Sequence, residues 1–168
     1  MVKAERQQRF RRIADEVTPA VAAYVARRQY PLAKADLDDI VSEVLLVLWR
    51  RLDAVPVDGA VPWAIGVARN VRRNAVRKAA NAAVTVSKLH SSGTTASAED
   101  VVIGDEGVKH ALLALSDDDR EIMMLHFWDG LSAAAIAAVL EISDNAAAVR
   151  LSRAQDRFRS HFSAAEIS

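Results

Sequence analysis

Residues 132–159 read SAAAIAAVLEISDNAAAVRLSRAQDRFR, a stretch that predicts two helices joined by a tight turn. Ser132 can cap a first helix that runs to residue 140, and residues 141–143 form the turn. A second helix is expected over 144–161, because its apolar positions are spaced four, three and four residues apart. These inward positions are Ala147, Leu151, Ala154 and Phe158. Two helices joined by a three-residue turn are typical of a helix-turn-helix.

The outward face of the second helix carries the residues that would meet a partner. They include Asn145, Ala148, Val149, Ser152 and Arg153. Residues 143–162 also hold four arginines against two aspartates, although acids outnumber bases over 107–168 as a whole. Arginines neutralise phosphates and donate paired hydrogen bonds to guanine, so the pattern favours DNA binding. From this segment alone, a helical bundle with a capped corner is the alternative.

Two further helices are expected ahead of this motif, over 107–115 and 116–128. Ser116 has the position of an N-cap, and the three aspartates after it suit the positive end of a helix dipole. Gly130 is the residue expected to close the second of these helices.

The first half of the chain predicts three helices, over 5–29, 37–52 and 63–78. Pro19 lies inside the first and predicts either a kink or a new helical segment. Two prolines and a glycine in 55–62 predict a loop. The middle helix has the most regular apolar stripe, formed by Leu37, Ile40, Val41, Val44, Leu45, Leu48 and Leu52.

The net charge of zero conceals an uneven distribution along the chain. Residues 1–88 carry 16 Lys and Arg against 9 Asp and Glu, whereas residues 107–168 carry 6 against 9. The segment 59–98 holds six bases and no acid. A basic stretch of this kind suggests a polyanionic partner, with a solvated helix face as the alternative.

Composition excludes several classes of protein. Cysteine is absent, no run of apolar residues is long enough to cross a membrane, and the N-terminus lacks the apolar core of a secretory signal. The four histidines show no metal-ligand spacing, and no Ser/His/Asp set or glycine-rich phosphate loop occurs. We therefore expect a cytoplasmic protein without membrane insertion, metal, cofactor or catalytic activity.

Helical periodicity without strand-like alternation predicts an all-α fold. The Ser/Thr/Gly-rich stretch 90–98 has the composition of a flexible linker. We expect two small helical domains, 1–86 and 107–168, joined by a flexible linker over 87–106.

Two stretches of the first half have the pattern of a known family. Residues 36–52, DLDDIVSEVLLVLWRRL, and residues 62–78, PWAIGVARNVRRNAVRK, are similar to the second conserved region of the RNA polymerase sigma factors of bacteria. Residues 111–159 are similar to the fourth, through Gly130-Leu131-Ser132, Ile136-Ala137, Ile142-Ser143 and Arg150 with Arg153-Ala154. A chain of this length would lack the extra domains of primary sigma factors, so the resemblance is to the small extracytoplasmic-function group.

The resemblance implies a sigma factor that binds core RNA polymerase and directs initiation at promoter DNA, and it implies an anti-sigma protein as a further partner. It assigns polymerase binding to Asp39, Ser42, Glu43, Leu46 and Arg50. It assigns the −10 element to Arg69, Asn70, Arg72, Arg73, Asn74 and Arg77, with the loop 53–61 as a base-specificity pocket. It assigns the −35 element to Asn145, Ala146, Ala148, Val149, Arg150, Ser152 and Arg153.

Three residues depart from the family pattern. Ala146 and Ala148 stand where a threonine and a basic residue are usual, and Glu141 replaces a usual turn glycine. Each alanine removes a polar contact, so we expect an unusual −35 sequence or a weaker −35 grip. If residue 141 has positive φ, glutamate costs about 1 kcal/mol there.

Two other interpretations stay open. A LuxR-type helix-turn-helix regulator would share Arg120-Glu121 and the Gly-Leu-Ser corner, but residues 1–88 lack the βα alternation of a receiver domain. A sigma-like interaction module that has lost DNA binding would explain Ala148 and the acidic second half.

Overall fold

The computed structural model describes residues 2–29, 31–87 and 105–167, which include every element of regular structure discussed below. In these residues all regular elements are helical, so the all-α prediction is confirmed. The chain divides into two compact units, Met1–Asp100 (unit 1) and Val101–Ser168 (unit 2). Most of the predicted linker, residues 88–104, lies outside the described residues. None of the described helices is both long and apolar enough to cross a membrane.

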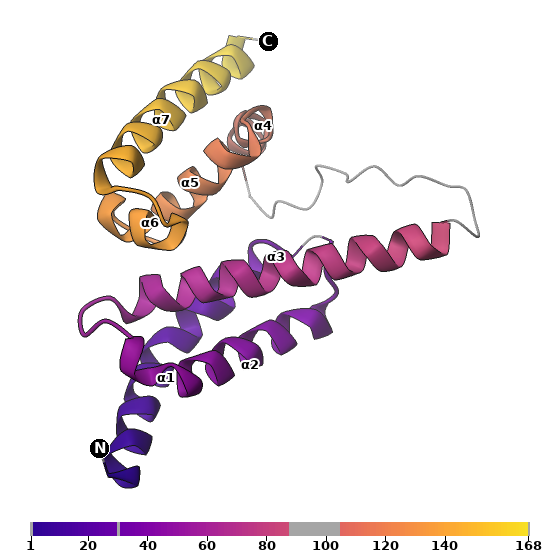
Figure 1. Cartoon of the computed structure of the whole chain (residues 1–168). Helices are drawn as coiled ribbons and strands as arrows, with labels where there is room; N and C mark the ends of the chain where they lie inside the picture. Colours follow the sequence, from indigo (N-terminus) through magenta and orange to yellow (C-terminus); the bar gives the residue numbers. More distant parts are fainter. Residues whose placement is uncertain (1, 30, 88–104, 168) are drawn as a thin grey trace. The chain divides into compact units, whose positions relative to one another are not determined.

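Unit 1 is a bundle of three helices, α1 (Lys3–Ala26), α2 (Lys34–Arg50) and α3 (Ala60–Ser87), with a short 3-10 turn η1 (Leu52–Ala54) after α2. Each helix packs against the other two (Figure 1). The chain stays helical through Pro19, so no new helix begins there. The most deeply buried side chains of the bundle include Val17, Val21, Tyr24, Val25, Val44, Leu48, Leu52 and Ile65.

The third helix is much longer than the predicted 63–78. It begins at Ala60 and reaches Ser87, because the alanine-rich segment 79–83 has high helix propensity and contains no glycine or proline. Its C-terminal turns extend past α2 (Figure 1), and residues 80–85 are exposed. The basic face of α3, which includes Arg69, Arg73 and Arg77, therefore lies on one uninterrupted helix.

Unit 2 contains α4 (Glu106–Ala114), α5 (Asp117–Phe127), α6 (Ala133–Leu140) and α7 (Asp144–Ile167), and α7 packs against the other three. The predicted caps are confirmed. The Ser116 hydroxyl accepts a hydrogen bond from the Asp119 amide at 3.2 Å, and the Ser132 hydroxyl accepts one from the Ala135 amide at 3.1 Å. Gly130 has φ +71°, the left-handed conformation that glycine tolerates best.

A single arginine joins α4 to α5. The Arg120 guanidinium donates hydrogen bonds to the carbonyls of Leu112, Leu113 and Leu115, at 2.9, 3.2 and 2.9 Å, and to the Asp117 carboxylate at 3.1 Å. The last carbonyls of a helix have no partner within it, so this side chain supplies the donors that the end of α4 lacks.

Candidate functional site

The turn between α6 and α7 is built from local hydrogen bonds. Glu141 adopts φ 56° and ψ 45°, in the left-handed region, and the Ile142 amide donates to the Ala137 carbonyl at 3.1 Å. The Ser143 hydroxyl then accepts from the Ala146 amide at 3.1 Å and caps the start of α7. These bonds fix the angle at which α7 leaves α6.

The first half of α7 separates a buried side from an exposed side. Ala147, Leu151 and Ala154 are buried against the rest of unit 2, as predicted. Of the residues predicted for the −35 element, Ala146 is half-buried. The others are exposed: Asn145, Ala148, Val149, Arg150, Ser152 and Arg153. The fold thus gathers the predicted reading residues on the accessible side of one helix.

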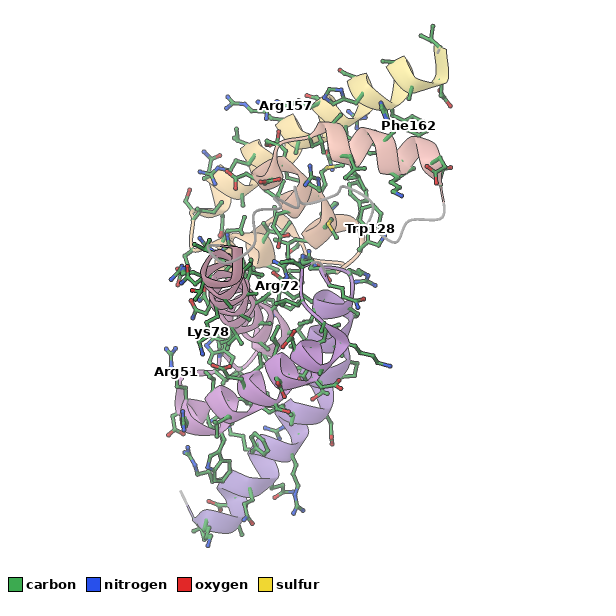
Figure 2. The ribbon with its side chains drawn as sticks, turned by 90° about the vertical axis from the view of Figure 1, so that its right-hand side faces the viewer. Arg51, Arg72, Lys78, Trp128, Arg157 and Phe162 are labelled. Carbon is green, nitrogen blue, oxygen red and sulfur yellow. The ribbon has the colours of Figure 1, made fainter. Side chains whose placement is uncertain are left out.

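In the second half of α7, two arginines form ion pairs with carboxylates of unit 2. Arg157 donates to the Asp119 carboxylate of α5 at 2.6 Å, and Arg159 pairs with Asp156 at 3.0 Å. The Phe158 and Phe162 rings stack with centroids 5.9 Å apart (Arg157 and Phe162 are labelled in Figure 2). Two of the four arginines counted in the sequence are therefore ion-paired, and the exposed arginines nearest the turn are Arg150 and Arg153.

The basic face of α3 holds five of the six residues predicted for the −10 element. Asn70, Arg73, Asn74 and Arg77 are exposed, and Arg69 is half-buried. Positions three and four apart share a helix face, so amide and guanidinium groups alternate along it. A row of this kind can contact successive phosphates and the edges of unstacked bases.

Arg72 lies on a different side of α3. Its Nε donates to the carbonyl of Arg28 at 2.9 Å, and its side chain is partly buried. Figure 2 labels Arg72 and Lys78, which leave α3 on different sides. Arg72 therefore ties α3 to the chain that follows α1, a role that the sequence pattern did not predict.

The residues predicted to bind polymerase all lie on the exposed side of α2, and they are Asp39, Ser42, Glu43, Leu46 and Arg50. Leu46 is 45% exposed, which is high for a large apolar side chain. An exposed leucine on this side of α2 offers apolar area that a protein partner would bury.

A groove of about 450 Å³ separates the acidic side of α2 from the basic side of α3. Its polar lining comes from Asp36, Asp39 and Glu43 on α2 and from Asn74, Arg77, Lys78 and Asn81 on α3. The two predicted surfaces of unit 1 therefore meet along this groove, and opposite charges face each other across it.

The loop before α3 is held by the first helix. Arg6 donates to the Asp53 carboxylate at 3.1 Å and to the Trp49 carbonyl at 2.8 Å, and Arg9 donates to the Val55 carbonyl at 3.4 Å. Trp63, near the start of α3, is half-buried, with the Arg51 guanidinium 6.0 Å from its ring. Residues 1–12 are rich in arginine, but the sequence pattern did not predict that Arg6 and Arg9 would hold the loop before α3.

Residues 106–156 match the family model described as Sigma-70, region 4. The chain is also 28% identical, over 163 residues, to a protein of Xanthomonas campestris pv. campestris described as a probable RNA polymerase sigma factor RfaY. That alignment covers 91% of this chain but only 40% of the relative, so the chain spans less than half of the relative's length.

Two solved structures share the fold. One is CnrH in complex with the cytosolic domain of CnrY, with a TM-score of 0.59 and 23% identity over 94% of this chain and 90% of that one. The other is the sigma factor RpoE in complex with the anti-sigma factor NepR from Bartonella quintana, with a TM-score of 0.59 and 21% identity over 96% of this chain and 98% of that one.

Proposed function

We propose that the chain is an RNA polymerase sigma factor of the extracytoplasmic-function type, which binds core RNA polymerase and directs it to start transcription at specific promoters. The match of residues 106–156 to sigma-70 region 4 and the 28% identity to a probable sigma factor support this proposal. In this proposal, α7 reads the −35 element in the major groove, and α3 opens and holds the −10 element. The sigma factor family is not known for catalysis, and the chemistry of RNA synthesis belongs to the polymerase.

The observation that carries the proposal is the exposed side of α7. It lies within the region that matches sigma-70 region 4, directly after a capped three-residue turn, and it bears Asn145, Ser152 and Arg153. Amide, hydroxyl and guanidinium groups on one face of a helix are the groups that read base edges in a major groove.

Unit 1 supplies the other two activities. We assign residues 1–86 to polymerase and −10 binding, residues 87–106 to a linker, and residues 107–168 to −35 binding. The exposed row on α3 and the exposed Leu46 on α2 support this division, because the row offers amide and guanidinium groups to nucleic acid and the leucine offers an apolar side chain to a protein.

An anti-sigma protein is a proposed further partner, working with this chain in the cytoplasm. Unit 2 has an apolar groove of about 420 Å³ lined by Leu112, Met123, Phe127, Trp128 and Phe158, together with Gln155 and Arg159. Phe127 is 57% exposed there. Exposed apolar surface of this kind supports binding of another protein.

Run-off transcription tests the proposal. Purified chain is added to core polymerase on a library of genomic promoter fragments, and RNA starting at a defined site is expected only when the chain is present. A LuxR-type regulator would need another sigma factor for any RNA, and a module without DNA binding would capture polymerase without defined starts. Either of these results would refute the proposal.

A further inference from the structure

The centre of the exposed side of α7 is apolar. Val149 is 38% exposed and lies nearly opposite the buried residues Ala147, Leu151 and Ala154 at 3.6 residues per turn. A branched apolar side chain offers no hydrogen bond to a base edge or a phosphate, so any base feature that Val149 reads on this surface must itself be apolar.

Val149 has a polar neighbour on either side along the helix. Asn145 lies one turn before it and Arg153 one turn after it, and both are exposed. Ala148 is exposed beside it and adds no polar group. The reading surface thus runs from an amide, through an apolar centre, to a guanidinium.

The major groove offers one apolar feature, the C5-methyl group of thymine, and apolar side chains contact it. Asparagine pairs best with adenine, and arginine pairs best with guanine. Resting on the proposed function of α7, we propose that Val149 is a specificity-determining residue that selects a thymine in the −35 element through its methyl group. The thymine lies between the positions that Asn145 and Arg153 read.

Methyl-deletion DNA tests the proposal. Holoenzyme made from the full chain and core polymerase first selects duplexes from a library with a randomised −35 element. Each selected thymine is then replaced by uracil, which removes the methyl group and keeps the pairing. One replacement should weaken holoenzyme binding about fourfold, the equivalent of one buried methyl group. 5-Methylcytosine at that position should bind more tightly than cytosine.

Two variants identify the residue that senses the methyl group. Val149→Ser removes both side-chain methyl groups at an exposed position, so the fold is retained, and the thymine and uracil duplexes should bind equally. Arg153→Ala is the matched control; it should weaken both duplexes and keep the fourfold ratio between them.

Three results would overturn the inference. Equal binding of every thymine and uracil duplex by the unaltered chain would show that no methyl group is read. A ratio unchanged in Val149→Ser would assign the reading to another residue. A holoenzyme that selects no −35 sequence at all would refute the proposed function itself, whereas the first two results leave that function standing.

Discussion

Glu141 occupies a backbone conformation that disfavours a side chain. Its φ of 56° lies in the left-handed region, where a Cβ costs about 1 kcal/mol. We predict that Glu141→Gly raises the unfolding free energy of unit 2 by about 1 kcal/mol, measured by native-state hydrogen exchange of α6 and α7 amides in the full chain.

The matched control for this substitution is Ala138→Gly in the preceding helix. Ala138 is exposed and helical, so glycine there should lower the same free energy by about 1 kcal/mol. Substitution by glycine should change the unfolding free energy in opposite directions at positions 141 and 138 if the backbone conformation of each position determines the effect. A loss of stability in Glu141→Gly would mean that the glutamate contributes a contact that outweighs its strain.

Arg120 supplies hydrogen-bond donors to the carbonyls at the C-terminal end of α4. Its guanidinium serves three carbonyls, and its side chain is 24% exposed. Arg120→Ala should lower the unfolding free energy of unit 2 by about 2–4 kcal/mol, because partly buried carbonyls lose charged donors. Protection of α4 amides against hydrogen exchange measures the loss.

Lysine at this position gives a sharper test, because it keeps the charge. A single ammonium cannot reproduce the guanidinium fork, so Arg120→Lys should recover less than half of the stability. The control is Arg159→Ala, whose ion pair is 72% and 70% exposed on its two sides and should contribute less than about 0.5 kcal/mol. Full rescue by lysine would contradict the carbonyl role.

At the scale of single helices, α2 is expected to carry the polymerase contact. Leu46→Asp should reduce binding to core polymerase more than tenfold without unfolding unit 1, because the leucine is already exposed. Val84→Asp is the control, since Val84 is 54% exposed on the same unit but lies outside the predicted contact residues. Pull-down titration with core polymerase compares the two variants. Equal binding by both would show that Leu46 does not lie in the polymerase interface.

The α3 face makes a different prediction. Changing Asn70 and Asn74 together to alanine should impair promoter opening, because the amides that we propose capture unstacked bases are lost, while polymerase binding stays intact. Permanganate footprinting of the −10 thymines measures opening. Asn81→Ala, another exposed asparagine of α3, should open promoters normally. Parallel loss of opening and polymerase binding would contradict the assignment.

The helices whose existence was predicted best are those with a regular apolar stripe and a recognisable cap. The serine before α6 and the one before α5 located both starts, because a capping hydroxyl has few other local uses. The ends of α3 and α7 were missed by several residues, since alanine-rich and charged segments permit a helix without requiring one.

Side-chain partners were beyond the reach of the sequence pattern. Arg72 resembled its basic neighbours in spacing, yet it donates to the Arg28 carbonyl, and Arg157 is paired with Asp119. Both contacts join residues far apart in the chain. Helix periodicity reports which face a residue occupies but not which atoms from another helix meet it.

Over the whole molecule, a neutral total charge is compatible with a polyanionic partner because the charges are separated. Residues 1–88 carry seven more bases than acids, and the acids of residues 107–168 exceed the bases by three. Under the proposed function, the net positive charge of residues 1–88 would attract DNA over a long range, whereas unit 2 would depend on the arginines that its fold leaves exposed.

Salt dependence of promoter binding separates these two contributions. Each phosphate contact to duplex DNA adds about 0.9 to the slope of log affinity against log salt, and each contact to a single strand adds about 0.7. Arg150→Gln should lower the slope of the open complex by about 0.9 if α7 lies on duplex DNA, and Arg73→Gln should lower it by about 0.7 if α3 lies on an opened strand. Arg159→Gln should leave it unchanged, because that arginine pairs with Asp156. An unchanged slope in Arg150→Gln would mean that Arg150 of α7 makes no phosphate contact. An unchanged slope in Arg73→Gln would mean that the excess positive charge of unit 1 binds the polymerase instead.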